Sequence, residues 1–115
     1  LLASHSEPVM THYDVWSGNV MVDLDGESPT VSGYIDIPGY YADYARELSF
    51  ALLFGVADRT FLDTYSSLRP LDPGFPVRVA IYNLKMNLRH IQMYPTQPVY
   101  AAGARQCLDE IGRYL

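Results

Sequence analysis

HYDVWSGN, at residues 12–19, constrains the architecture of this chain more than any other segment. Its His12, Asp14 and Asn19 follow the spacing H-x-D-x-x-x-x-N. On such a loop a carboxylate can accept the proton of an attacking hydroxyl, and an amide oxygen further along can bind a divalent cation from the other side of the turn. His12 is expected to support the loop through hydrogen bonds. The spacing is typical of a kinase catalytic loop and predicts a site for phosphoryl transfer.

A second acidic residue follows where this chemistry needs one. Val20 to Leu24 and Val31 to Ile35 are predicted to form a short antiparallel hairpin around the turn-forming Asp25-Gly26. Asp36 comes directly after the second strand, where kinases place a metal-binding aspartate. Asn19 and Asp36 are therefore expected at the two ends of one hairpin, close enough to share a Mg²⁺ ion that bridges the phosphates of ATP.

The remainder of the chain has the pattern of helices. Asp43 can cap a helix that begins near Tyr44, and Gly55 can end it. A second short helix is expected around Phe61 and Tyr65, and residues 69–74, with two prolines and a glycine, predict a turn.

Two further helices are predicted after that turn. Apolar residues at spacings of three and four indicate one buried face on a long helix from Phe75 to Met93: Val77, Ile81, Leu84, Leu88 and Ile91. A last helix, from about Val99 to Tyr114, is expected to bury Tyr100, Ala104, Cys107, Leu108 and Ile111. Together these patterns predict a mainly α, α+β fold in which a catalytic loop and a short hairpin precede about four helices, all within a single domain over residues 1–115.

Composition excludes several classes of protein. The 115 residues are 49% apolar and 18% charged, as in a globular domain, and contain no apolar run of about eighteen residues that could cross a bilayer. A net charge of −5 argues against nucleic-acid binding and suits a cationic substrate. The single cysteine, Cys107, excludes an internal disulfide, and residues 1–10 lack the pattern of a secretory signal. We expect a cytoplasmic protein with no membrane or nucleic-acid partner.

The segment DVWSGN, residues 14–19, closely resembles the H-G-D-L-W-S-G-N signature of fructosamine kinases and their aminoglycoside phosphotransferase relatives. YID at 34–36 with YYAD at 40–43 is similar to the family's I-D-P-A-x-Y-Y-G-D, and EL at 47–48 with LFG at 53–55 is similar to its D-L-A and L-F-G. PLDPGF at 70–75 and the pattern from Arg78 to His90 resemble its P-L-D-P-G-F-x-x-R and Y-x-L-x-x-x-L-x-H. The resemblance covers roughly residues 9 to 93.

This resemblance implies the C-terminal lobe of a protein-kinase-like fold. It implies that Asp14 is the catalytic base, that Asn19 and Asp36 hold Mg²⁺, and that His12 and Glu47 support the catalytic loop. Possible substrate contacts, each of which also has an ordinary packing interpretation, are Tyr13, Trp16, Tyr40, Tyr41 and His90. Trp16 is expected to pack under the loop. The implied activity is transfer of the γ-phosphate of ATP to a hydroxyl of a small fructosamine- or ketosamine-like substrate.

Some features depart from this pattern and leave alternatives open. Tyr13 replaces a glycine of the family signature, and Glu47 replaces an aspartate. No glycine-rich loop precedes the site, and the single lysine, Lys85, falls on the long helix. We therefore expect the N-terminal ATP-binding lobe to be absent from these residues and the isolated fragment to be inactive. An aminoglycoside or amino-alcohol (choline-like) phosphotransferase, and a non-catalytic kinase-like binding module, are the alternatives.

Overall fold

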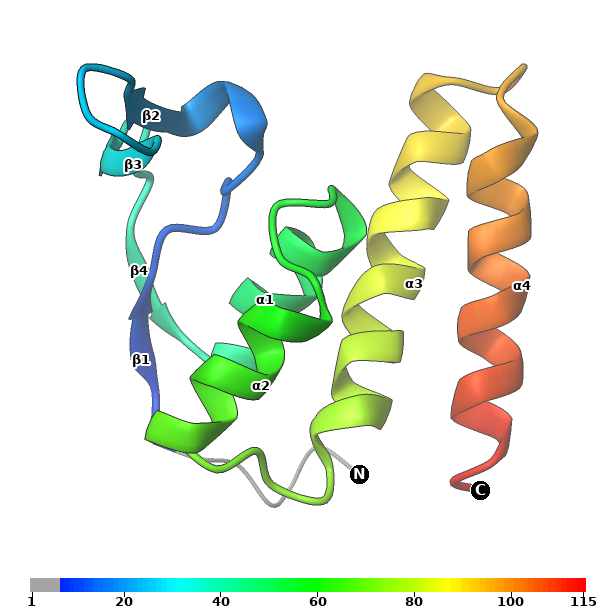
Figure 1. The fold of residues 1–115 in the computed structure, drawn as a ribbon. Helices are drawn as coiled ribbons and strands as arrows, with labels where there is room; N and C mark the ends of the chain where they lie inside the picture. The colour runs from blue at the N-terminus through cyan, green and yellow to red at the C-terminus, as the bar shows by residue number, and fades with distance from the viewer. Residues whose placement is uncertain (1–6) are drawn as a thin grey trace.

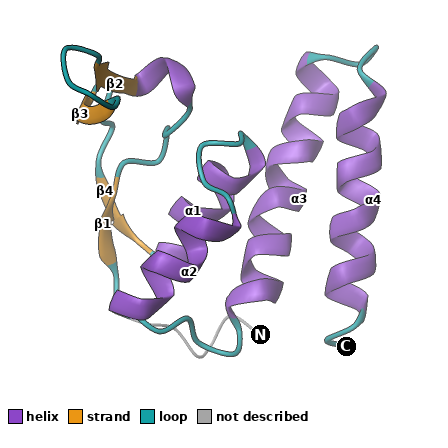
Figure 2. Cartoon of the chain, viewed as in Figure 1, coloured by secondary structure: helices purple, strands orange, loops and turns teal. Residues whose placement is uncertain are grey.

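A computed structural model describes residues 7–115, in which short strands lie to one side of four helices (Figures 1 and 2). Residues 1–6, which include most of the segment considered for a secretory signal, lie outside the described residues. The elements are β1 (Val9–Thr11), a 3₁₀ turn η1 (Ser17–Asn19), β2 (Val20–Asp23), β3 (Thr30–Tyr34), β4 (Tyr40–Ala42), α1 (Tyr44–Leu53), α2 (Arg59–Leu68), α3 (Phe75–Met93) and α4 (Pro98–Gly112). This confirms a mainly helical α+β chain.

The hairpin predicted after the loop is present as β2 and β3. The two strands pair antiparallel, with Val20 opposite Tyr34, and the register is irregular between Met21 and Val22. Ile35 N donates to Asn19 O at 3.1 Å, so the pairing continues for one step beyond the strands. The end of the loop of residues 12–19 is thereby joined to the residue before Asp36.

A second ladder, β1 with β4, was not predicted. Thr11 lies opposite Tyr40 and Val9 opposite Ala42, and the buried Thr11 hydroxyl donates to Tyr40 O at 2.8 Å. Each strand has three residues, too few for an alternating pattern to stand out in the sequence. This ladder sets the position of the loop of residues 12–19, which follows β1, relative to α1, which follows β4 (Figure 1).

The first helix begins as predicted, and the second contains Phe61 and Tyr65 as predicted. The Asp43 carboxylate accepts a hydrogen bond from Ala45 N at 3.0 Å at the start of α1. Gly55 follows that helix with a φ of 70°, a conformation that glycine adopts without strain. Asp58 caps α2 in the same way, by accepting from Phe61 N at 2.8 Å.

The long helices α3 and α4 lie side by side, but their predicted buried faces are partly wrong. Leu88 is 51% exposed and Leu108 is 56% exposed. The buried positions include Val77, Ala80 and Asn87 of α3 and Ala104 of α4. A side chain at Gly103 would lie 2.7 Å from Asn87 Oδ1, so the helices approach each other through small residues that leave the two leucines outside the contact. Among the described helices none is both long and apolar enough to cross a bilayer.

A buried arginine ties the helices together. The Arg78 side chain is 1% exposed, and its guanidinium donates to Asp43 Oδ2 at 2.8 Å and to both oxygens of Asp72 at 2.7 and 2.6 Å. The hydroxyls of Tyr44 and Tyr82 complete the cluster by donating to Asp72 and Asp43, respectively. The bonds from Arg78 hold the pKa of Asp72 well below its usual range. This network fixes the start of α1, the turn before α3 and α3 itself as one unit.

Candidate active site

The loop of residues 12–19 leaves β1 through an unusual backbone conformation at Tyr13. Its φ is 72°, in the left-handed region, where a residue with a side chain is strained by about 1–3 kcal/mol. Glu47 Oε2, on α1, accepts a hydrogen bond from Tyr13 N at 2.7 Å. The Arg46 guanidinium carbon lies 3.6 Å from the centre of the Tyr13 ring, in cation–π geometry. Contacts from α1 thus offset the strain at this residue.

His12 bridges the loop and the hairpin. Its Nε2 lies 2.9 Å from Ile35 O, and its Nδ1 lies 3.3 Å from Asp14 N. The tautomer protonated on Nε2 satisfies both contacts, because Nε2 then donates to the carbonyl and Nδ1 accepts from the amide. The backbone at Asp14 is held against the residue that precedes Asp36.

Asp14 and Asn19 are paired across the loop. Asn19 is 5% exposed, and its Nδ2 donates to both Asp14 O and Asp14 Oδ2 at 3.0 Å. These bonds fix the orientation of the Asp14 carboxylate and leave its second oxygen for another partner. They also turn the Asn19 Oδ1 oxygen away from Asp14, where it can accept a cation or a donor.

Asp36 lies at the exit from the hairpin. Its side chain is exposed and its φ is 57°, a conformation that aspartate tolerates better than most residues. The bond between Ile35 N and Asn19 O places it next to the buried end of the loop. Among residues 7–115 no three His, Cys, Asp or Glu side chains are grouped as a metal cage. An amide and a carboxylate oxygen at adjacent backbone positions fit Mg²⁺ that takes its other ligands from phosphate and water.

A groove of about 330 Å³ opens beside the Asp14 carboxylate. Its walls come from the loop, α1 and α3, namely Asp14, Trp16, Phe50, Phe54, Met86, Arg89, His90 and Met93. Trp16 is 46% exposed, so it does not pack under the loop as expected. Its ring lies over Gly18, where an added Cβ would be 2.6 Å from Trp16 Cζ2. The indole therefore forms part of the groove wall because Gly18 leaves room for it.

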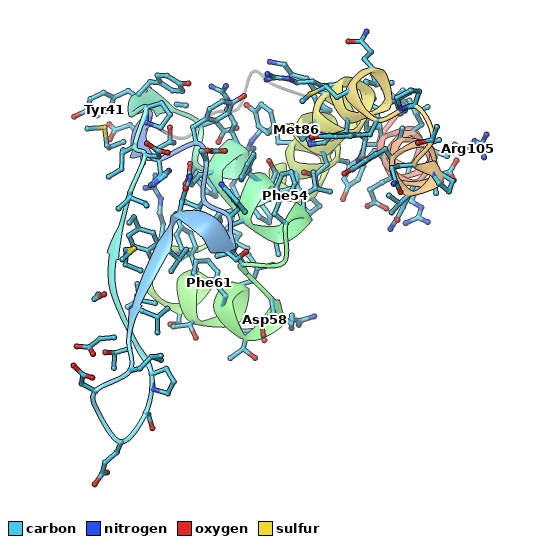
Figure 3. All side chains as sticks on the ribbon, turned by 90° about the horizontal axis from the view of Figure 1, so that it is seen from above. Tyr41, Phe54, Asp58, Phe61, Met86 and Arg105 are labelled. Carbon is cyan, nitrogen blue, oxygen red and sulfur yellow. The ribbon has the colours of Figure 1, made fainter. Side chains whose placement is uncertain are left out.

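The other possible substrate contacts do not all lie near the loop. His90 lines the groove, donates from Nδ1 to Met86 O at 2.9 Å and stacks on Tyr100 with ring centres 4.8 Å apart. Tyr40 lies against Tyr13, with ring centres 5.4 Å apart. Tyr41 is 73% exposed and projects away from α3 (Figure 3). His90 and Tyr40 therefore lie close to the loop that contains Tyr13, whereas Tyr41 lies away from it.

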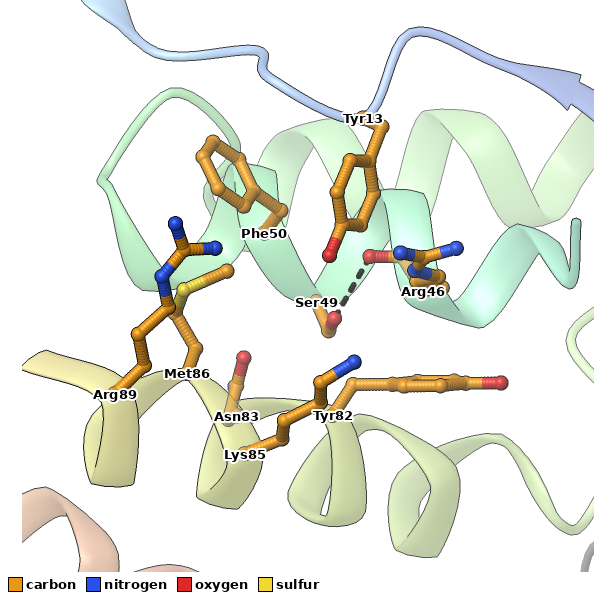
Figure 4. Close-up of a pocket in the computed structure, with 9 residues that line it drawn as sticks. All are labelled: Tyr13, Arg46, Ser49, Phe50, Tyr82, Asn83, Lys85, Met86 and Arg89. Atoms are coloured by element: carbon orange, nitrogen blue, oxygen red, sulfur yellow. Dashed lines mark hydrogen bonds between the residues drawn. The ribbon is translucent and has the colours of Figure 1, made fainter. Parts of the chain in front are cut away.

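Three cationic residues near the loop were not identified from the sequence. Arg46 of α1 and Lys85 and Arg89 of α3 line a cavity of about 60 Å³ beneath Tyr13 (Figure 4). Lys85 and Arg89 are four residues apart and therefore share a face of α3, which the sequence could have shown. That this face turns toward α1 depends on helix packing, which the spacing alone does not specify.

Comparisons with protein families and with individual proteins agree on one family. A family model described as fructosamine kinase matches residues 1–113. A probable ketoamine kinase of Enterococcus faecium is 33% identical over 87 residues, which cover 76% of this chain and 30% of that protein. The ketosamine-3-kinase of Mus musculus is 35% identical over 83 residues, which cover 72% of this chain and 25% of that protein. The chain thus spans less than a third of the length of these relatives.

A solved structure shows the same fold. A crystal structure assigned as a fructosamine-3-kinase of Haemophilus somnus matches with a TM-score of 0.68 and 22% sequence identity. The match covers 95% of this chain and 36% of that one. The arrangement of loop, hairpin and four helices is therefore that of one part of a larger chain in the solved protein.

Proposed function

Because the chain belongs to the fructosamine kinase family, we propose that it supplies the catalytic loop of a kinase that phosphorylates a hydroxyl of a small ketosamine. The observation that carries this proposal is the pairing of Asp14 with the buried Asn19, at 3.0 Å from Nδ2 to Oδ2. A carboxylate that is held by one oxygen and lines a groove is arranged to accept a proton from an acceptor hydroxyl.

The proposed reaction is transfer of the γ-phosphoryl group of ATP. The acceptor hydroxyl oxygen forms a bond to the γ-phosphorus, the bond from that phosphorus to the β–γ bridging oxygen breaks, and ADP leaves. The hydroxyl proton passes to the free oxygen of Asp14. The groove of about 330 Å³ beside this carboxylate is large enough for a sugar-sized acceptor.

Asn19 Oδ1 and the Asp36 carboxylate are the groups that we propose for Mg²⁺. When bound, the ion would neutralise charge on the phosphate oxygens. His12 and Glu47 are positioning residues in this proposal: His12 bonds Ile35 O, beside Asp36, and Glu47 bonds Tyr13 N, beside Asp14. Trp16 and His90 would contact the acceptor as walls of the groove.

The groups that grip ATP are proposed to lie outside these 115 residues. Kinases position the phosphates with a glycine-rich loop and a strand lysine, whereas the single lysine of this chain, Lys85, lies on α3. The relatives are more than three times as long as the matched segment. We therefore propose that residues 1–115 form a C-terminal catalytic lobe that has no transferase activity by itself. Because its single cysteine requires no oxidising environment, we propose the cytoplasm as its compartment.

The test is phosphorylation of a fructosamine by the complete protein that contains this chain. Asp14→Asn keeps the shape of the side chain and removes the base, and we expect it to lower kcat by about 10²–10⁴-fold. Asp109→Asn, an exposed change on α4, is the matched control and should leave kcat unchanged. Circular dichroism would verify that both variants fold.

Two results would contradict the proposal. Activity that survives Asp14→Asn would mean that the base is another group. A complete protein that phosphorylates no ketosamine would exclude the ketosamine kinase itself, and the chain would then serve a different acceptor or act as a non-catalytic module.

A further inference from the structure

The cavity beneath Tyr13 is strongly cationic in a chain that is acidic overall. We name it the basic pocket. Its polar lining residues are Tyr13, Arg46, Ser49, Tyr82, Asn83, Lys85 and Arg89. Among residues 7–115, no aspartate or glutamate lines it. Three of the eight Lys and Arg residues of a chain with net charge −5 therefore converge on one cavity.

These charges are not neutralised within the described part of the chain. The ion pairs found among residues 7–115 involve Arg59, Arg78 and Arg113, and none of the three cations of the basic pocket. The acidic residues at the start of α1 have other partners, since its N-cap Asp43 is bonded to Arg78 and Glu47 to Tyr13 N. A positive potential of this kind favours an anionic ligand.

The size and contents of the basic pocket suit a small anion. Its volume of about 60 Å³ is several times the space that one water molecule needs. Lys85, Arg89 and Met86 project from α3 toward Tyr13 and Phe50 above them (Figure 4). Arg46 is already held against the Tyr13 ring, so it presents its charge at the rim without further ordering.

The basic pocket adjoins the proposed active site. Phe50, Met86 and Arg89 line both this pocket and the groove that contains Asp14. A molecule that placed a hydroxyl beside Asp14 could therefore reach the cations with a second group. Tyr13, at the roof of the basic pocket, is the residue immediately before Asp14.

We propose that the basic pocket binds a carboxylate carried by the phosphate acceptor, so that ketosamines of free amino acids are the preferred substrate class. This inference rests on the proposed function. A ketosamine formed from a free α-amino acid carries a carboxylate one carbon away from its amine, whereas one formed on a protein side chain lacks a carboxylate there. A phosphate of the nucleotide is the other anion that could use the same cations, and the experiment separates the two.

The test compares two acceptors that differ in one charge, N-(1-deoxyfructosyl)glycine and its glycinamide, with the complete protein. We expect kcat/KM to be higher for the carboxylate by at least about tenfold, as for one charge-assisted hydrogen bond. Lys85→Gln and Arg89→Gln, both exposed positions on a helix, should each reduce this preference several-fold. Arg105→Gln, on the outer face of α4 (Figure 3), removes one positive charge elsewhere and should retain the preference for the carboxylate.

The outcomes distinguish this inference from the proposed function. Equal use of the two acceptors, or a preference that persists in the Lys85→Gln, Arg89→Gln double variant, would overturn the inference and leave the kinase proposal standing. A rise in the KM for ATP with an unchanged acceptor preference would assign the cations to the nucleotide and would also overturn it. Phosphorylation of neither acceptor would reject the ketosamine kinase and, with it, the inference.

Discussion

Replacement of Arg78 by methionine tests whether the buried ion cluster holds the helices that carry the site. The guanidinium is 1% exposed and makes three hydrogen bonds to carboxylates, at 2.6 to 2.8 Å. Methionine has a similar length and no charge. The change therefore removes the cation and leaves Asp43 and Asp72 close together in a partly buried site.

The loss of unfolding free energy depends on the hydrogen-bond donors that these carboxylates keep. Removal of one partner from a buried ion pair typically costs about 3–5 kcal/mol, because the remaining charge is no longer compensated. Asp72 keeps the Tyr44 hydroxyl and Gly74 N as donors, and Asp43 keeps Ala45 N and the Tyr82 hydroxyl. We therefore expect a loss of about 3 kcal/mol, a large part of the roughly 5–15 kcal/mol that stabilises a domain.

Urea unfolding of the protein that contains this chain, followed by far-UV circular dichroism at pH 7, would measure the loss. The unfolding midpoint should fall by about 1–3 M for Arg78→Met. Arg105→Met, at an exposed position of α4, should change the unfolding free energy by less than about 0.5 kcal/mol. A loss below about 1 kcal/mol for Arg78→Met would show that the cluster contributes no more than a surface ion pair, and would refute its role in holding α1 and α3.

Three further predictions concern the loop and the acid range. Gly18→Ala would bring a Cβ to 2.6 Å from Trp16 Cζ2, so the indole must move. We expect a shift in the fluorescence of Trp16 and a higher KM for the acceptor. Glu47→Ala removes the acceptor for Tyr13 N and should lower kcat by about 10–100-fold, whereas Glu47→Gln, which keeps an acceptor oxygen, should lose less. The pKa of Asp72 lies below its ordinary value of 3.8, chiefly because a buried guanidinium hydrogen-bonds it. Its stabilising contribution is therefore complete above that value and is lost as the pH falls below it, so the unfolding free energy of Asp72→Asn should decline less than that of the wild type between pH 6 and pH 3.

Each of these predictions has a contrasting outcome. Gly112→Ala, at a position with nothing within 4 Å of an added Cβ, is the control for Gly18→Ala, and an unchanged emission spectrum in the latter would mean that the indole does not lie over Gly18. Equal losses for the two Glu47 variants would show that the carboxylate, rather than an acceptor oxygen, is what the loop needs. Parallel acid profiles for the wild type and Asp72→Asn would contradict the lowered pKa of that carboxyl.

Local patterns in the sequence were sufficient for much of the fold. The cap at Asp43, the stop at Gly55 and the bounds of α3 each depend on residues within one or two turns of chain, where capping and φ preferences act. The hairpin of β2 and β3 has its strands close together in the sequence. The start of β2 was predicted correctly, and the other three strand ends were each predicted to within one residue. The order of catalytic-loop motif, hairpin and aspartate was likewise visible in the sequence.

The sequence did not show which faces of the long helices are buried. Leu88 and Leu108 match an apolar stripe yet are exposed, because periodicity shows that a helix has a face but not which neighbour it meets. The β1–β4 ladder pairs residues about thirty positions apart and leaves no local signal. The exposed setting of Trp16 depends on its contact with Gly18 across a turn, which composition cannot reveal.

Charge separates most clearly what the sequence determines from what the tertiary structure decides. The sequence by itself determined the family, the order of the proposed site residues and a net charge of −5, which suggested a cationic substrate. Only the tertiary structure showed that Arg46, Lys85 and Arg89 meet beside the loop while the nearby carboxylates of Asp43 and Glu47 are bonded elsewhere. Net charge is a sum over the whole chain, whereas the potential at a site depends on distance and pairing, so the packing of α1 against α3 decides which ligand this acidic chain can hold.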